Sequence, residues 1–306
     1  MTDRREPVVL VTGVTGQVGA ELLLRLRNDI RAVGVDRNQL DLSDLGQIRR
    51  VISDVCPSII LNAAAYTAVD QAESDQSKAM RINGEAPGVL AEEARRIGAL
   101  LVHYSTDYVF DGTKDGAYDE TDLPNPLNVY GATKLAGERA IAQVGGAWAV
   151  LRTSWVYGMH GKNFLLTMLR LAQQKSELSV VADQFGAPTW SRTIAEMTAR
   201  MLEQPSGGLA AAREAWIDRS GVYHLTTAGA TSWAGFAQAI FAHAGLSAPP
   251  TVLPISTDQY PTPARRPHNS RLSNAKLTEV FGIRPPQWDD ELGRCLTVLR
   301  AAREGR

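Results

Sequence analysis

The sequence predicts an α/β fold, built on a Rossmann-type doubly wound parallel sheet with a smaller C-terminal lobe. Short apolar runs alternate with helix-like segments through the first half of the chain, a pattern typical of parallel strands joined by helical crossovers. These runs are rich in Val, Ile and Leu and lack polar alternation, as in strands covered on both faces. A glycine-rich turn follows the first run directly, where folds of this class bind ligands.

Five apolar runs are predicted to form the strands of this sheet. In chain order they span residues 8–13, 31–36, 58–64, 100–106 and 147–154. Apolar residues at helical spacing predict intervening helices over 19–29 and 83–98. The second of these ends at Gly98, in the position of a capping glycine.

The second half of the chain is less regular, and we expect it to form mainly an interleaved substrate-binding lobe over residues 156–306. Residues 1–155 are predicted to form the Rossmann core, and strands near 178–182 and 222–227 are predicted to return to it. The helical patterns of this half cover residues 163–174, 191–204 and 232–245. Residues 205–216 indicate a loop insertion, and prolines punctuate 248–270, as in a surface segment that folds over a ligand.

The composition is that of an ordinary soluble globular protein. Of the 306 residues, 44% are hydrophobic and 21% charged, and the net charge is -1. No nucleic-acid or membrane partner is expected, because such partners usually require a concentrated basic face. Cys56 and Cys295 lie far apart and outside any CxxC pair, which argues against a disulfide scaffold or a structural zinc site. Since neither a signal-peptide pattern nor an apolar run of about 20 residues is present, we expect a cytoplasmic protein.

The stretch "TGVTGQVG" places Gly13, Gly16 and Gly19 directly after the first strand. Glycines at this spacing allow a tight turn, a close approach of backbone to pyrophosphate, and close packing of helix on sheet. A helix beginning near Gln17 directs its free N–H groups at the phosphates. In this context the stretch predicts a dinucleotide-binding loop.

The residues after the second strand bear on the choice of cofactor. Asp36 stands where a carboxylate accepts hydrogen bonds from the adenosine ribose and repels a 2′-phosphate. Arg37 follows it and suits that phosphate, although a solvated surface role is at least as common, so NADH and NADPH both stay open. Asp41 is either beside the adenine edge or at the start of a helix.

Tyr130 and Lys134 in "YGATK" share one helical face, because 3.6 residues make a turn. Alone, such a pair is common on helix surfaces. Its position after "STDYVF" and "NAAAYT", which end two strands at the expected ligand crevice, favours a reductase. There Tyr130 supplies a proton, Lys134 lowers the pKa of the Tyr130 phenol, and Thr106 polarises the substrate carbonyl.

Two other residue types are interpreted as structural. His103, inside a strand, is predicted to be a satisfied core residue and not a catalytic base. The tryptophans outside the motifs are predicted to pack in the interior. They are Trp190, Trp216, Trp233 and Trp288.

Six motifs, "TGVTGQVG", "LNAAAYTAVDQAE", "HYSTDYVFDG", "NVYGATKLAGE", "LRTSWVYG" and "DQFGAPT", occur in this order, with "RRPHNSRLSNAKL" after them. Their order resembles the extended short-chain dehydrogenase/reductase superfamily. More narrowly, the chain resembles the dTDP-4-dehydrorhamnose reductase family from Val8 to about Trp288.

This resemblance implies reduction of the 4-keto group of dTDP-4-dehydro-β-L-rhamnose to dTDP-L-rhamnose, the last step of dTDP-rhamnose biosynthesis, by NADPH or NADH. It implies that Tyr130 is the proton donor and that Lys134 supports it and holds the nicotinamide ribose. The implied catalytic and substrate-binding residues are Thr106, Tyr130, Lys134, Asp107, Val69 and Trp155. The implied cofactor-binding residues are Gly13, Gly16, Gln17, Val18, Gly19, Asp36, Asp41, Leu42, Ala65, Tyr66, Thr67, Tyr104, Tyr130 and Lys134.

The chain also departs from the family pattern. Some members hold magnesium at a dimer contact made by acidic side chains. Glu21 fits one such position, but "PTWSRT" has no acidic residue where another would fall, so magnesium is doubtful and no metal site is predicted. A monomer or a homodimer is expected. Arg265 and Arg266 suit either a diphosphate or a structural role.

Two alternative functions stay open. Another nucleotide-sugar enzyme of this fold, such as a 4-epimerase, would retain bound NAD. A 4,6-dehydratase would need an Asp-Glu pair beside the threonine, whereas Asp107 is followed by Tyr108. From a different class, a non-catalytic regulatory subunit would bind nucleotide without turning over a sugar.

Overall fold

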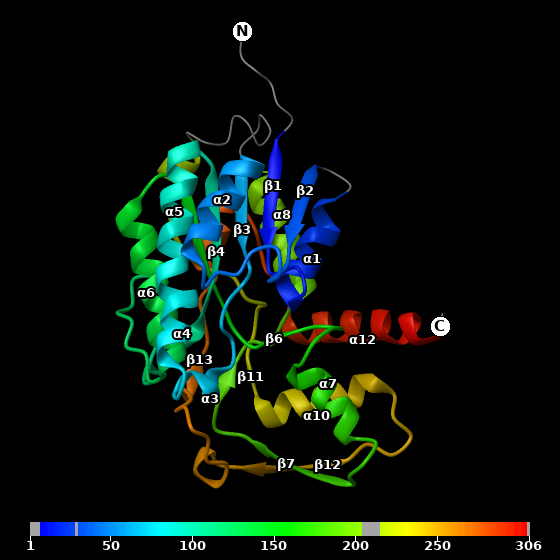
Figure 1. The fold of residues 1–306 in the computed structure, drawn as a ribbon. Coiled ribbons are helices and arrows are strands. Elements are labelled where there is room, and N and C mark those ends of the chain that lie inside the picture. Colours follow the sequence, from blue (N-terminus) through cyan, green and yellow to red (C-terminus); the bar gives the residue numbers. More distant parts are fainter. Residues whose placement is uncertain (1–6, 28–29, 204–214, 305–306) are drawn as a thin grey trace.

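In a computed structural model, which describes residues 7–27, 30–203 and 215–304, a six-stranded parallel sheet forms the larger part of the molecule (Figure 1). The strand order is β10-β5-β4-β3-β1-β2, and every pairing is parallel. This confirms the predicted doubly wound fold. The strands are β1 (Val8–Thr12), β2 (Arg31–Val35), β3 (Ile59–Asn62), β4 (Leu100–Thr106), β5 (Trp148–Thr153) and β10 (Gly221–His224).

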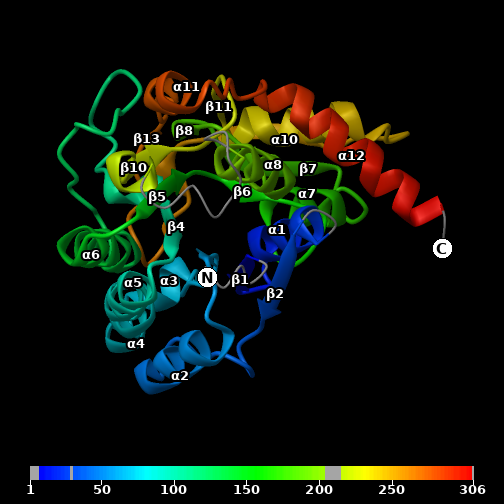
Figure 2. The same cartoon turned by 90° about the horizontal axis from the view of Figure 1, so that it is seen from above.

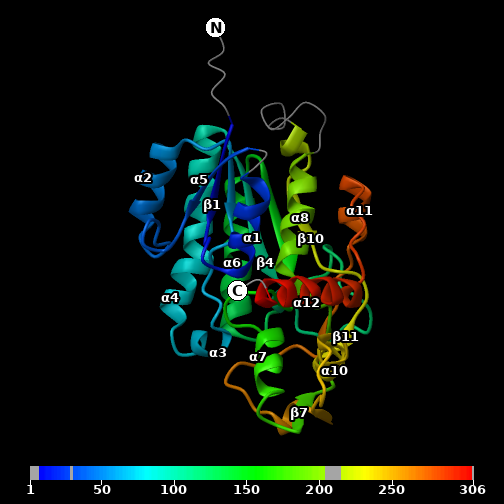
Figure 3. The ribbon, with the colours of Figure 1, turned by 90° about the vertical axis from the view of Figure 1, so that its right-hand side faces the viewer.

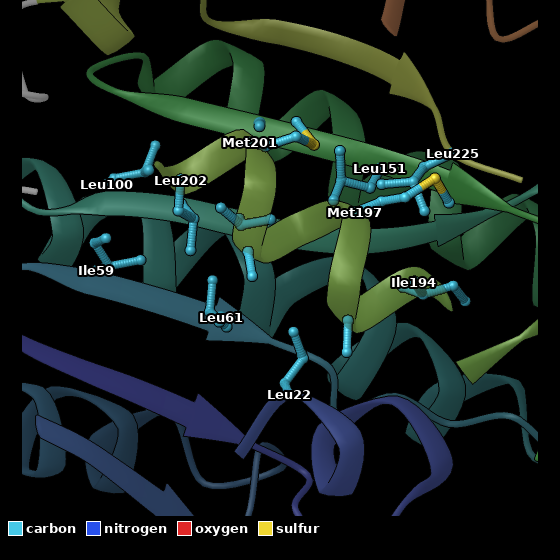
Figure 4. Packing of buried hydrophobic residues seen from close by; sticks show 14 of the residues in the cluster. Leu22, Ile59, Leu61, Leu100, Leu151, Ile194, Met197, Met201, Leu202 and Leu225 are labelled. Atoms are coloured by element: carbon cyan, nitrogen blue, oxygen red, sulfur yellow. The ribbon is translucent and has the colours of Figure 1, made fainter. Parts of the chain in front are cut away.

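Helices cover both faces of this sheet (Figures 2 and 3). Alternate residues of a strand point to opposite faces, so Val9 and Val11 of β1 join one buried cluster and Leu10 the other. The first cluster packs under α1 (Gln17–Leu26) and α8 (Ser191–Leu202), with Leu22 and Ile194 among its members (Figure 4). The second packs under α2 (Leu45–Val55), α5 (Ala86–Ile97) and α6 (Val129–Val144). Both faces are therefore dry, as the continuous apolar strands required.

Helix boundaries follow local signals in the sequence. Helix α1 starts at Gln17, directly after Gly16, and α5 ends at Gly98, whose φ of 73° is left-handed. The helix predicted over 83–98 is longer than expected. It begins as α4 (Gln76–Met80) and passes through one π-helical turn (Arg81–Glu85) into α5. Short elements α3 (Val69–Ala72) and η2 (Asp107–Val109) follow β3 and β4.

The remaining chain forms a smaller lobe, which Figure 1 shows below the sheet. Its helices are α7 (Phe164–Leu171), α10 (Trp233–Ala244) and α12 (Trp288–Glu304), and these share a separate buried cluster. Small sheets complete it, pairing β6 (Val156–Tyr157) with β9 (Thr189–Trp190) and β8 (Phe185–Gly186) with β11 (Thr231–Ser232) and β13 (Asn269–Ser270). Helix α11 (Ala275–Phe281) packs back near β10, and η3 (Thr257–Gln259) lies in the lobe's proline-rich segment.

Two strand predictions in this half need correction. The strand near 178–182 does not return to the central sheet, because β7 (Glu177–Val181) pairs with β12 (Thr251–Ile255) in a two-stranded sheet of the lobe. Its burial alternates, unlike that of the fully buried β3 and β4, so it is covered on one face only. Strand β12 was not predicted, since its Pro254 argues against a strand. Pro254 is accommodated because β12 pairs with a neighbour on one side only.

The remaining predictions for the second half of the chain concern a strand, an insertion and the domain boundary. The strand near 222–227 does lie in the central sheet, as β10 beside β5. Residues 205–214 of the predicted insertion lie outside the described residues, while Trp216 at its end is buried against Phe281. The division at residue 155 stays a prediction. Among the described residues, no helix is both long and apolar enough to cross a membrane.

Candidate functional site

A cavity of about 980 Å³ lies at the carboxyl ends of the central strands. Segments that follow β1, β2, β3, β4 and β5 all contribute to its wall, which is where ligands bind in open parallel sheets. The predicted site residues that line it are Gly13, Gly16, Gln17, Val18, Asp41, Leu42, Ala65, Tyr66, Thr67, Val69, Tyr104, Thr106, Asp107, Tyr130, Lys134 and Trp155. Gly19 and Asp36 do not line it.

The glycine loop between β1 and α1 needs its glycines for space. Gly13 has a φ of 68°, and a Cβ there would come within 2.9 Å of the Ala64 backbone. A Cβ on Gly19 would overlap the Gly13 carbonyl oxygen, so Gly19 lets helix and loop pack closely without reaching the cavity. The first turn of α1, with no side-chain cap at Gly16, leaves its N–H groups at the cavity wall. This is a site for an anion such as a pyrophosphate.

In the segment after β2, Asp36 takes part in a turn. Its Oδ1 accepts hydrogen bonds from the backbone N–H groups of Asn38 and Gln39, at 2.9 Å and 3.1 Å, so this carboxylate stabilises a turn. Arg37 lines the cavity instead, and its Nε lies 3.6 Å from Asp41 Oδ2. A cationic side chain therefore lies on the cavity wall directly after β2, and a contact of Asp36 with the cofactor stays a prediction.

Asp41 lines the cavity and is not the cap of α2. The capping residue is Asp44, which accepts from the Gln47 N–H. Asp41 accepts from the backbone and hydroxyl of Ser43, and the backbone hydrogen bond is the main reason why its pKa is lowered. Asp41 was expected either beside the adenine edge of the cofactor or at the start of a helix. The structure places it at the cavity and not at the start of α2.

Asn83 fixes the loop after β3. Its amide accepts from the Tyr66 N–H at 2.8 Å and donates to the Tyr66 carbonyl at 3.0 Å. Asn83 lies in the π-helical turn and is buried, and it also donates to Thr133 of α6. This side chain thus joins the cofactor-side loop to the helix that carries Tyr130.

Tyr130 and Lys134 both reach the cavity from α6, whose N-cap is Asn128. Burial raises the pKa of Tyr130 to about 12, with a further contribution from Asp107, while a hydrogen bond with Thr106 opposes the shift. The net shift of this pKa is upward, and a lowering by Lys134 stays a prediction. Desolvation outweighs the other influences on the phenol.

Lys134 is 1% exposed, and its ammonium nitrogen donates to the Tyr104 carbonyl at 2.6 Å. It also lies 3.0 Å from His103 Nε2. Burial lowers the pKa of Lys134 to about 7, and Glu138 acts in the opposite direction. Lysine at this position therefore changes charge near neutral pH.

Thr106 ends β4 beside these residues, and Asp107 follows it as the first residue of η2. Both are buried, and the Thr106 hydroxyl donates to Asp107 Oδ1 at 3.0 Å. Burial raises the pKa of Asp107 to about 6, whereas hydrogen bonds with Ser270 and Thr106 lower it. A carboxyl group that is protonated in part near neutrality lies next to the phenol of Tyr130.

An aromatic pair forms the wall on the lobe side. Trp155 has a left-handed φ of 48° and stacks on Trp233, with ring centroids 3.6 Å apart and planes 8° apart. A Cβ on Gly186 would come within 2.6 Å of the Trp155 ring, so glycine makes room for it. A left-handed tryptophan is a strained conformation of the kind that concentrates at functional sites.

Trp233 corrects a sequence prediction, because it lines the cavity instead of packing only in the interior. Its Nε1 donates to Gln184 Oε1 at 3.2 Å, and Gln184 belongs to the "DQFGAPT" motif. Lys78 and Lys162 also line the cavity and were not predicted. Neither lies in a motif with a phosphate-binding spacing, so the sequence carried no signal for them.

Other side chains considered in the sequence are engaged elsewhere. Arg266 pairs with both carboxylate oxygens of Asp70, at 2.7 Å and 2.9 Å, and lies outside the cavity wall. Glu21 pairs with Arg192, at 3.0 Å, within the same chain. No cluster of three or more His, Cys, Asp or Glu side chains in the described part of the chain is arranged to hold a metal ion.

Comparisons with known proteins point in one direction. A family model described as the RmlD substrate binding domain matches residues 7–301. The chain is 51% identical over 297 residues to a dTDP-4-dehydrorhamnose reductase of Burkholderia thailandensis, covering 95% of this chain and 98% of that protein. It is 41% identical to the protein of that name in Escherichia coli K12, covering 95% and 97%.

Solved structures similar to this chain include a protein of the same name. The crystal structure of a dTDP-4-dehydrorhamnose reductase from Bacillus anthracis in complex with NADP matches with a TM-score of 0.88 at 35% identity, covering 96% of this chain and 100% of that one. A UDP-glucose 4-epimerase of Thermus thermophilus in complex with NAD matches with a TM-score of 0.78 at 22% identity, covering 96% and 99%. The second likeness concerns the fold alone.

Proposed function

This chain belongs to the dTDP-4-dehydrorhamnose reductase family, and from that we propose that it reduces the 4-keto group of dTDP-4-dehydro-β-L-rhamnose to give dTDP-L-rhamnose, using NADPH or NADH. One observation carries the proposal. The glycine loop, Thr106, Tyr130 and Lys134 line a single cavity at the carboxyl edge of the sheet. Residues suited to dinucleotide binding and to proton donation therefore share one cavity.

Reduction of a ketone adds hydride to carbon and a proton to oxygen, and the reduced nicotinamide supplies the hydride when it is bound. The N–H groups at the start of α1 and the glycine loop would hold its pyrophosphate. We assign the proton to Tyr130, whose raised pKa keeps it in the phenol form that can donate. When the sugar is bound, the Thr106 hydroxyl would donate to the sugar carbonyl in place of Asp107 Oδ1, its acceptor in this structure, and a charged Lys134 would stabilise the phenolate that remains.

Another part of the cavity wall suits the sugar nucleotide. Trp155 and Trp233 form an apolar and aromatic surface, and Asp107 and Val69 complete the side near Tyr130. Lys78 and Lys162 are exposed cations on the cavity wall and supply charge for phosphate oxygens. We expect the enzyme to act in the cytoplasm as a monomer or homodimer, which size-exclusion chromatography with light scattering will distinguish.

The test is oxidation of NADPH and of NADH, followed by absorbance, with dTDP-4-dehydro-β-L-rhamnose. Wild type should oxidise the cofactor, and Tyr130→Phe should lose about 10² or more of kcat because it has no proton to give. Tyr157→Phe is the matched control, since Tyr157 is a buried tyrosine outside the cavity. It should keep wild-type kcat.

Two results would contradict the proposal. Folded wild-type protein that binds NADP but oxidises no cofactor with this sugar would favour the regulatory interpretation. Interconversion of sugar epimers with tightly retained NAD would favour a 4-epimerase.

A further inference from the structure

His103 joins the catalytic lysine to the interior of the sheet. It lies in the middle of β4 and is 1% exposed. Its Nε2 lies 3.0 Å from Lys134 Nζ, and its Nδ1 lies 2.9 Å from the amide nitrogen of Asn62 on the neighbouring β3. Asn62 in turn bonds Thr12 of β1, whose hydroxyl donates to Asn62 Oδ1 at 2.7 Å. A buried polar chain therefore runs across three strands and ends at Lys134.

The protonation states of these hydrogen-bonded side chains depend on one another. Burial and the nearby charge of Lys134 hold the pKa of His103 well below its usual value, so the ring is neutral and carries one N–H. An ammonium group donates only, so a charged Lys134 requires Nε2 to accept. The single ring proton then sits on Nδ1, and Asn62 must present its oxygen to it. Thr12 permits this, because a hydroxyl accepts as well as donates.

The structure has the opposite orientation of the Asn62 amide. Asn62 presents its amide nitrogen to Nδ1, which leaves the ring proton on Nε2 and pairs with an uncharged Lys134. Both arrangements satisfy the contacts between neighbours. The protonation of Lys134 is thus linked to the tautomer of His103 and to the orientation of Asn62.

Few other charges act on this pair. In the sheet, Asn62 and Val150 flank His103 in register, and neither ionises. On α6, Tyr130 lies one turn before Lys134 and Glu138 one turn after it. The ionisable groups nearby on β4, η2 and β5 are Tyr104, Asp107 and Arg152.

Glu138 alone among these favours the charged lysine, and its carboxylate is already bound by Arg152 and Ser105. His103 and the Tyr104 carbonyl are the groups in direct hydrogen-bond contact with Lys134 Nζ among the described residues. Loss of the His103 contact would therefore leave the buried ammonium with one acceptor.

We propose that neutral His103, oriented by Asn62, is a positioning residue that accepts a hydrogen bond from the Lys134 ammonium and sets the pH range over which Lys134 stays charged. The inference deepens the proposed function, because it rests on Lys134 serving the reduction. It also makes a statement about protonation that is measurable without turnover.

The kinetic test compares His103→Leu with His103→Gln across pH 5.5 to 9. Glutamine places an amide oxygen near the position of Nε2, so it keeps an acceptor that leucine lacks. In His103→Leu the pH above which kcat falls should move down by about one unit, because a hydrogen bond to the charged form is lost. In His103→Gln that pH should stay near the wild-type value, and the KM of the sugar should change less than about threefold in both.

The matched control is His224→Leu, since His224 is a fully buried histidine of the same sheet on β10. It should leave the pH profile unchanged. If His103→Leu lost the same fraction of kcat at every pH, or if His103→Gln shifted the profile as much as leucine does, the positioning role would be disproved.

A second measurement is independent of any sugar. In protein labelled with ¹⁵N-histidine, the His103 signals are those missing from His103→Gln. At pH 6, Nε2 should carry no proton, and its shift should change around the pH at which Lys134 loses its charge. In Lys134→Met that change should be absent. A protonated Nε2 at pH 6 would overturn the inference, whether or not the wild-type enzyme reduces the sugar.

Discussion

Burial drives the two central residues of the site toward their uncharged forms. It raises the pKa of Tyr130 to about 12 and lowers that of Lys134 to about 7, because desolvation penalises whichever form carries charge. The result is a phenol that stays protonated beside a lysine that ionises near neutral pH. The spacing of the two residues did not predict these pKa shifts. It sets the direction in which the two side chains leave the helix, but not how deeply they are buried.

A prediction at the same scale concerns cofactor choice. Arg37 lines the cavity and is exposed, whereas Asp36 does not line it and its Oδ1 accepts hydrogen bonds within a turn. Arg37→Ala should raise the KM of NADPH about tenfold or more, because a charge-assisted contact with the 2′-phosphate is lost. The KM of NADH should change less than about twofold. Initial-rate kinetics with both cofactors measure this.

Arg50→Ala serves as the control for that experiment. Arg50 is an exposed arginine on the nearby α2, paired with Asp44, and does not line the cavity. An equal rise in KM for NADPH and NADH in Arg37→Ala would show that Arg37 does not read the phosphate.

At the scale of elements, α6 is held close to the rest of the core. A Cβ on Gly131 would overlap the Tyr108 carbonyl, and one on Gly137 would overlap the Asn83 carbonyl. Further along, Glu138 accepts from Arg152 of β5 and, at 2.5 Å, from Ser105 of β4. These contacts set the position of the helix that carries Tyr130 and Lys134.

The Glu138–Arg152 pair yields a stability prediction. Both side chains are 4% exposed, so Glu138→Gln leaves a buried guanidinium without its counter-charge. The free energy of unfolding should fall by about 3–5 kcal/mol. Urea denaturation followed by circular dichroism measures the change.

Glu92→Gln is the comparison, since Glu92 pairs with Arg49 at the surface, where the side chains are 50% and 48% exposed. The Glu92→Gln change should lower the free energy of unfolding by less than about 1 kcal/mol. Equal losses in the two variants would show that burial does not govern the strength of the Glu138 pair.

For the whole molecule, the buried lysine links the site to the pH dependence of folding. The folded pKa of Lys134 lies below its ordinary value of 10.5, so between about pH 7 and pH 10 the unfolded chain binds more protons than the folded one. Stability contributed by this group therefore rises with pH across that window and is lowest below pH 7.

Lys134→Met should remove this slope. From pH 7 to pH 9 the free energy of unfolding of wild type should rise by about 2 kcal/mol relative to the variant. Denaturant unfolding of both proteins at the two pH values measures the difference. Parallel pH profiles would mean that Lys134 keeps an ordinary pKa in the folded protein.

Patterns within the amino-acid sequence were enough to predict the alternation of strands and helices, the parallel sheet and the glycine loop. These are local or periodic properties, because a strand buried on both faces must be apolar throughout and a tight turn must contain glycine. The sequence also indicated most of the residues that meet at the cavity, since the carboxyl ends of parallel strands lie on one edge.

Which of these side chains line the cavity, and which are engaged elsewhere, depends on the three-dimensional fold. The turn after β2 engages Asp36 and leaves Arg37 at the cavity, and Trp233 reaches the cavity from a lobe helix far away in sequence. Strand β7 pairs with β12 and not with the central sheet. His103 meets Lys134 across 31 positions of the chain. Such pairings and the burial that shifts a pKa depend on contacts between distant segments, which no local pattern records.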